Sequence, residues 1–151
     1  MSSPVLYLDT SAWLKLYINE DGSELVLQTV TESEQICTHL IAYTELRSAL
    51  ARAERENRIE PSQKVKIIEV MEKDWPTLNI IQSIETLVRR AGLLCDQFGL
   101  RGFDSIHLAS AEAISLQMMP KITIFASFDR KLNKAAHALG MSILPVTERN
   151  R

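Results

Sequence analysis

The sequence is poor in the residues that cross-link a chain or anchor it in a membrane. It has two cysteines among 151 residues, and no apolar run comes close to the ~20 residues that a membrane-spanning helix needs. Cys37 and Cys95 follow no metal-ligand spacing and both lie in apolar runs, so we expect free, buried thiols in a reducing compartment. The segment from Met1 to Tyr7 lacks the basic residues and long apolar stretch of an export signal. We therefore expect a cytoplasmic protein without a membrane segment.

An excess of one charge is also missing. The formal net charge is -2, which argues against a protein whose affinity for nucleic acid comes mainly from a basic surface. This balance does not exclude a nuclease, because carboxylates that gather to hold metal are themselves acidic. The bound cations reverse the local charge where a phosphate must approach. Composition therefore leaves a metal-dependent nuclease open.

Short apolar runs alternate along the chain with amphipathic stretches. The runs predict strands at Val5–Leu8, Gln35–Thr38, Leu78–Ile81, Ile122–Ala126 and Met141–Val146. The stretches predict helices at Ala12–Tyr17, from Ser23 to about Val30, at Leu40–Asn57, from Glu60 to just before Trp75, and at Ile84–Phe98, Asp104–Leu116 and Arg130–Leu139. Parallel neighbours need a crossover, which a helix supplies. We therefore expect an α/β fold, a three-layer α/β/α sandwich with a mainly parallel sheet of about five short strands, in a single domain over residues 1–151.

Four carboxylates occupy places where ligands collect in such a fold. In an open parallel sheet, ligands bind outside the carboxyl ends of the strands. Asp9 closes the first expected strand, and Asp129 follows the strand Ile122–Ala126 by a short step. Asp104 opens the most apolar helix of the chain, and Glu45 lies at the border of the apolar stripe of its helix.

Each acid alone also has a purely structural interpretation. Asp is a good helix cap, worth ~1 kcal/mol, so Asp9, Asp104 and Asp129 each fit the start of the helix that follows. Glu45 alone fits a solvated helix boundary. Four carboxylates that converge, however, repel one another unless a cation compensates. Oxygen ligands of this kind suit Mg²⁺ (or Mn²⁺) better than zinc, and such a metal activates water for attack on a phosphodiester.

Four segments, in chain order, resemble the motifs of the PIN-domain family, and most closely those of the VapC-type toxins of toxin-antitoxin pairs. These segments are Tyr7–Ala12, Tyr43–Leu46, Gly99–Ala109 and Ala126–Leu132. The resemblance covers essentially the whole chain. It implies a PIN-like fold and a magnesium-dependent endoribonuclease whose acidic site is formed by Asp9, Glu45, Asp104 and Asp129. It also implies an RNA substrate, a homodimer and a cognate antitoxin protein that blocks the site.

Residues next to the four acids receive supporting roles. Ser11 and Ser127 match the family's hydroxyl positions beside the first and last acids, where they orient a carboxylate or a metal-bound water, or else cap a helix. Arg101 and Arg130 are the candidates for phosphate contact, because each neighbours a proposed metal ligand. His107 fits either a general base near the site or a core histidine bonded to a neighbour, and we favour the core histidine.

Three other functions stay open at this point. A HAD-type phosphatase or phosphotransferase would use Asp9 as its nucleophile, but such enzymes resemble a pattern with a second acid two residues later, where this chain has Ser11. A receiver-like signalling domain also collects acids at strand ends, but its phosphoacceptor is expected nearer the middle of the chain. A non-catalytic PIN scaffold would bind RNA or protein only, and the intact set of four acids argues against it.

Overall fold

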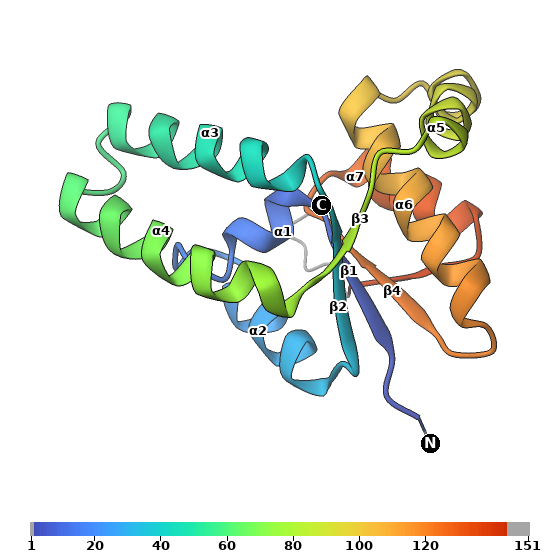
Figure 1. Cartoon of the computed structure of the whole chain (residues 1–151), viewed down its shortest axis with the longest axis horizontal. Helices are drawn as coiled ribbons and strands as arrows, with labels where there is room; N and C mark the ends of the chain where they lie inside the picture. The colour runs from blue at the N-terminus through green and yellow to red at the C-terminus, as the bar shows by residue number, and fades with distance from the viewer. Residues whose placement is uncertain (1, 145–151) are drawn as a thin grey trace.

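The computed structural model describes residues 2–144, in which five strands form one sheet with helices on both faces (Figure 1). The strands are β1 (Val5–Leu8), β2 (Gln35–His39), β3 (Asn79–Ile81), β4 (Thr123–Ala126) and β5 (Ser142–Ile143). Their spatial order is β3-β2-β1-β4-β5, and every neighbouring pair is parallel. The strand order therefore reverses between β1 and β4, which is where an open α/β sheet forms a crevice at the carboxyl ends of its strands.

Helices fill both outer layers of the described part of the chain. They are α1 (Thr10–Leu14), α2 (Ser23–Glu32), α3 (Ala42–Arg55), α4 (Pro61–Asp74), the 3-10 turn η1 (Trp75–Thr77), α5 (Glu85–Phe98), α6 (Gly102–Met118) and α7 (Arg130–Ala138). Helices α1 to α4 cover one face of the sheet, and α5 to α7 cover the other (Figure 1). The predicted three-layer α/β/α sandwich with a parallel sheet is confirmed.

The central strand β1 is buried on both faces, which explains its unbroken apolar run. Leu8 packs with Trp13 in the core under α1 to α4, whereas Tyr7 packs with Phe125 in the core under α5 to α7. All four side chains are fully buried. The residue that follows this strand, Asp9, is thereby held at the middle of the carboxyl edge of the sheet.

Local signals set several helix ends. Pro61 is the first residue of α4, and Glu60 and Gln63 form a capping box around it. Gly99 has a φ of 66° directly after α5, a left-handed conformation that ends the helix. The chain then re-enters a helix at Gly102, which places the next acid on its first turn.

Several predicted helix boundaries were wrong by a few residues, and three of them bear on the position of the candidate site. The first helix ends at Leu14 and continues as turns, instead of reaching Tyr17. Helix α3 begins at Ala42, because the Leu40 N–H still bonds to the last residue of β3, at 3.0 Å. Helix α6 begins at Gly102, so Asp104 is not its N-cap.

The chain end and the cysteines also differ in part from expectation. The predicted strand Met141–Val146 is observed only as Ser142–Ile143, and its positions 145 and 146 lie outside the described residues. Cys37 is a buried free thiol as predicted, but Cys95 is only partly buried. Within residues 2–144, no helix is long and apolar enough to cross a membrane.

Candidate active site

Asp9 lies where β1 passes into α1, and both elements fix its carboxylate. Its backbone N–H donates to the Ala126 carbonyl at the end of β4 (3.1 Å), and its side chain caps α1 by accepting from the Ala12 N–H (2.9 Å). The side chain is 95% buried, with 5% exposed. Burial raises the pKa of Asp9, although the electrostatic influence of His107 and hydrogen bonds from Ser127, Ser11 and Ala12 oppose the rise. A buried carboxylate of this kind gains stability from any cation that reaches it.

Two serine hydroxyls join the Asp9 end of β1 to the Asp129 end of β4. Ser11 donates to Asp9 Oδ1 (2.7 Å) and accepts from the Phe128 N–H (3.0 Å). Ser127, which is buried, accepts from the Asp129 N–H (3.1 Å), and its hydroxyl also lowers the pKa of Asp9 by hydrogen bonding. Neither serine is a helix cap, so the structure favours the carboxylate-orienting role.

Asp129 itself caps the helix α7. Its Oδ1 accepts from the Leu132 N–H at 2.9 Å, and the residue is partly buried. The capping interpretation is therefore confirmed for both Asp9 and Asp129, but it uses only some of the lone pairs of each carboxylate.

Glu45 enters the site from α3 and is held by two donors. Thr10 Oγ1 donates to Glu45 Oε1 at 2.6 Å, and His107 Nε2 lies 2.7 Å from the same oxygen. Burial alone would raise the pKa of Glu45, but the hydrogen bonds from His107 and Thr10 outweigh it and lower the pKa. Glu45 is therefore held ionised.

His107 is a buried link between the core and Glu45. The Tyr7 hydroxyl lies 2.7 Å from His107 Nδ1, inside the core. A neutral imidazole with its proton on Nε2 satisfies both neighbours, since Nδ1 then accepts from Tyr7 while Nε2 donates to Glu45. The expectation of a core histidine bonded to a neighbour is confirmed, and that neighbour is one of the predicted site residues.

Asp104 lies on the first turn of α6, three residues before His107. Its Oδ2 accepts from Arg101 Nε at 3.1 Å, and the Arg101 side chain is 84% exposed. An exposed pair of this kind contributes only about 0–1 kcal/mol, so Asp104 can exchange its partner at little cost.

Shared neighbours link three of the four predicted acids, namely Asp9, Asp129 and Glu45. Ser11 and Ser127 join Asp9 to the Asp129 loop, and His107, which bonds to Glu45, also acts electrostatically on Asp9. As the side chains are placed, no three His, Cys, Asp or Glu residues within 2–144 form a group that could hold a metal ion. The metal-binding role of Asp9, Glu45, Asp104 and Asp129 thus stays a prediction.

A cavity of about 860 Å³ opens beside Glu45. Its wall includes Thr10 and Ser11 from the start of α1, Glu45 and Arg52 from α3, and Arg101 from the loop before α6. This volume lies within the range of small-ligand sites. Of the two arginines predicted to contact phosphate, Arg101 lines the cavity, whereas Arg130 is exposed at the start of α7.

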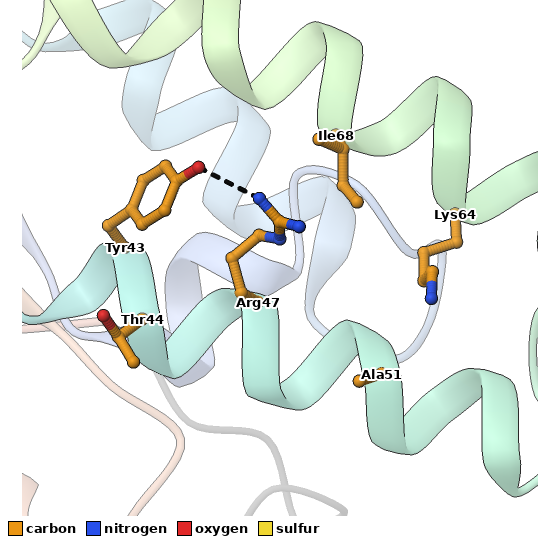
Figure 2. Close-up of a pocket in the computed structure, with 6 residues that line it drawn as sticks. All are labelled: Tyr43, Thr44, Arg47, Ala51, Lys64 and Ile68. Atoms are coloured by element: carbon orange, nitrogen blue, oxygen red, sulfur yellow. Dashed lines mark hydrogen bonds between the residues drawn. The ribbon is translucent and has the colours of Figure 1, made fainter.

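A second cavity, of about 290 Å³, lies between α3 and α4 (Figure 2). Arg47 donates to the Tyr43 hydroxyl at 3.0 Å, and this hydroxyl donates to Glu72. Lys64 pairs with Glu54 at 3.0 Å. The two positively charged side chains that line this cavity, Arg47 and Lys64, therefore already have partners within the protein, and none of the four predicted acids lines it.

Two residues of the site had no role in the sequence interpretation. Thr10 holds Glu45, but a threonine in the first turn of a helix gives no sign of a partner 35 residues away. Asn133 is buried on α7 and donates to the Ser127 carbonyl at 2.9 Å, which fixes the loop between β4 and α7. Its signal was available in principle, because an amide side chain beside the apolar Leu132 and Ala136 is unusual on a helix that packs on a core.

Comparison with known proteins places this geometry in a family. The model of the PIN domain matches residues 6–138. Ribonucleases VapC45 and VapC49 of Mycobacterium tuberculosis are each 33% identical over 142 residues, which cover 94% of this chain and 96% of theirs.

Solved structures show the same fold at lower identity. FitAcB from Neisseria gonorrhoeae matches with a TM-score of 0.67 and 17% identity, over 93% of this chain and 96% of that chain. VapC20 from Mycobacterium tuberculosis, described as a sarcin-ricin loop cleaving toxin, matches with a TM-score of 0.63 and 14% identity, over 93% of this chain and 99% of that one. With the four motifs in order, and with Asp9 and Asp129 at the switch point between β1 and β4, the chain belongs to the PIN-domain family and, within it, to the VapC-type toxins.

Proposed function

We propose that this protein is a Mg²⁺-dependent (or Mn²⁺-dependent) endoribonuclease that hydrolyses RNA phosphodiester bonds, and that it is the toxin of a toxin-antitoxin pair. The observation that carries the proposal is the joined carboxyl ends of β1 and β4, where Ser11 and Ser127 hold Asp9 and the Asp129 loop together. The relatives named as ribonucleases match 94% of the chain, and the PIN-domain match spans residues 6–138, which include both ends of this arrangement.

The chemistry of the donor set fits a hard divalent cation. Asp9, Glu45, Asp104 and Asp129 offer carboxylate oxygens, which Mg²⁺ and Mn²⁺ prefer. When bound, such a metal binds a phosphodiester oxygen, activates a water molecule and stabilises the charge on the leaving oxygen. Asp104 Oδ2 accepts from Arg101, whose exposed side chain can turn from Asp104 to a substrate phosphate at little cost.

The protein's own groups prepare the site. Ser11 and Ser127 orient the Asp9 carboxylate, while Thr10 and His107 keep Glu45 ionised and fixed in direction. Because these donors are already in place, little reorganisation is needed when a substrate arrives.

The phosphatase alternative is weaker on the same geometry. In that reading a second acid would stand two residues after Asp9. Here Ser11 takes that place and spends its hydroxyl hydrogen on Asp9 Oδ1, which leaves no acid there to protonate a leaving group.

We also propose that the protein pairs with a cognate antitoxin and forms a homodimer. Support for the antitoxin comes from structural neighbours such as VapBC2 from Rickettsia felis, whose structure is described as bound to a DNA fragment from the VapBC2 promoter. This neighbour matches with a TM-score of 0.62 and 16% identity, over 93% of this chain and 99% of that one. Light scattering on the purified chain tests the dimer, for which a single monomer mass at all concentrations is the contradicting result.

The ribonuclease is tested on a panel of structured RNAs with the purified, antitoxin-free protein. We expect discrete cuts in Mg²⁺ that disappear in EDTA and in the Asp9→Asn variant. Release of phosphate from small phosphoesters without any RNA cuts would favour the phosphatase. Binding of RNA without cuts or phosphate release would favour a non-catalytic scaffold.

A further inference from the structure

The cavity beside Glu45 is lined by an aromatic ring and arginine side chains that have no role in the proposed hydrolysis step. Phe103 lines it and leaves 60% of its surface exposed. Arg52, on α3, and Arg58, in the turn after α3, line the same cavity. An exposed aromatic ring with two guanidinium groups is the combination by which proteins hold single-stranded nucleic acid.

The backbone of Arg58 is fixed where α3 ends. Asn57 has a φ of 59°, in the left-handed region, and the Arg58 N–H donates to the Ala53 carbonyl at 2.8 Å. The next residue, Ile59, is 7% exposed and anchors the turn in the core. The Arg58 side chain therefore reaches the cavity from a rigid base.

Both arginines can exchange their present partner. Arg52 Nε and Arg58 Nη2 lie 3.8 Å and 3.2 Å from the Glu56 carboxylate, and all three side chains are about half exposed or more. Solvent-exposed ion pairs of this kind contribute little stability. A phosphate group, which accepts two parallel hydrogen bonds from a guanidinium, is a competitive replacement for Glu56.

We propose that this cavity is the subsite for an unpaired nucleotide next to the cleaved bond of the RNA, whose base stacks on Phe103 and whose phosphates bind Arg52 and Arg58. The inference rests on the ribonuclease activity proposed above. Phe103 directly precedes Asp104, and Glu45 lies in the cavity wall, so a phosphodiester held at the acids has its neighbouring nucleotide in the cavity.

The subsite determines which RNA structures are cut. Stacking on an aromatic ring tolerates every base, whereas a base inside a duplex is already stacked and paired. Unpaired bases in loops, bulges and ends can be splayed out onto a protein ring. The enzyme therefore selects unpaired segments, and stacking contributes affinity with little preference among the four bases.

Binding is tested with short single-stranded RNAs that carry 2-aminopurine, a base whose fluorescence falls when it stacks on an aromatic ring. Phe103→Leu is expected to abolish this quenching and to weaken binding at least about fivefold, whereas Phe103→Tyr retains both. Since Phe103 is exposed, neither variant should alter thermal unfolding appreciably.

The phosphate contacts are tested by salt dependence. Arg58→Ala is expected to weaken binding and to reduce the slope of log affinity against log salt by about 0.7. Arg89→Ala is the matched control, because Arg89 is an exposed arginine with a glutamate partner on α5, and we expect no change in its affinity or slope.

Cleavage of the same RNAs separates this inference from the proposed function. If the wild type cleaves these RNAs but Phe103→Leu binds them and quenches 2-aminopurine as strongly as the wild type does, the subsite is overturned. The exposed Phe103 ring would then be assigned to a contact with another protein. Quenching that depends on Phe103 without any cleavage would support the subsite and contradict the ribonuclease. Equal affinity for duplex and single-stranded forms of one sequence would also overturn the subsite.

Discussion

Replacement of Tyr7 by Phe isolates the hydrogen bond that connects the core to the candidate site. The hydroxyl lies 2.7 Å from His107 Nδ1, and both groups are buried. A Phe at this position keeps the stacking of the ring on Phe125 (centroids 5.7 Å apart) and its edge contact with His107 (5.8 Å). Tyr7→Phe therefore removes the donor to His107 and an oxygen near Ser110 and Thr38, both of which keep their bonds to backbone carbonyls, and it removes little packing.

The size of the effect follows from the acceptor that is left behind. A buried nitrogen without its donor costs about 1–3 kcal/mol of the free energy of unfolding. For a chain of this length, that corresponds to a fall in Tm of about 2–12 °C. The proton of His107 is then no longer directed to Nε2, so Glu45 loses part of its restraint, and kcat for RNA cleavage should fall together with stability.

Urea unfolding followed by circular dichroism measures the first effect, and RNA cleavage at saturating substrate measures the second. Tyr17→Phe is the matched control, because the Tyr17 hydroxyl donates to Asp74 at 2.6 Å on α4, away from the acids. We expect the control to lose stability while it retains kcat. The reasoning is refuted if the free energy of unfolding of Tyr7→Phe lies within about 0.5 kcal/mol of that of the wild type, or if both variants lose the same fraction of kcat.

Three further predictions concern the fold. Burial lowers the pKa of His39 from 6.5 to about 4. The neutral ring therefore contributes stability above pH 6.5 that is lost as the pH falls toward 4, and the free energy of unfolding should drop over this range by up to about 3 kcal/mol. His39→Gln should remove this dependence on pH. Gly22→Ala should cost about 1–3 kcal/mol, because φ is 95° and the new Cβ would lie 2.5 Å from Phe128, whereas Gly92→Ala, in open space within α5, should be neutral or stabilising in the same denaturation assay. Burial raises the pKa of Cys37 to about 11, so in the folded protein its thiol should react with a thiol reagent more slowly than the other cysteine, and equal rates would contradict the buried position.

The sequence predicts the ends of strands better than the contacts across layers. A buried parallel strand is a continuous apolar run, so the polar residue that stops it is visible in the chain, and Asp9 could be placed at the sheet edge from this signal alone. Asp129 follows its strand in the same way. The positions of Asp9 and Asp129 could therefore be predicted from the local apolar pattern, and their capping role could be predicted because Asp is a favoured helix N-cap.

The network around Glu45 could not be read from the chain. Tyr7 and His107 are 100 residues apart, and His107 and Glu45 are 62 apart, so their meeting depends on how α3 and α6 pack against opposite faces of the sheet. Each residue alone resembles an ordinary member of its element. The exposed ring of Phe103 is likewise invisible in the sequence, where an aromatic at the start of an apolar helix suggests core packing.

The central claim, that Asp9, Asp104, Asp129 and Glu45 hold a divalent metal, is tested most directly by Mn²⁺ binding measured by electron paramagnetic resonance. The same titration is made on the wild type, on Asp9→Asn and Asp104→Asn, and on Asp96→Asn, which changes an exposed aspartate on α5. We predict that the two site variants weaken Mn²⁺ binding while Asp96→Asn binds as the wild type does. Equal Mn²⁺ affinity in all four proteins would contradict the claim.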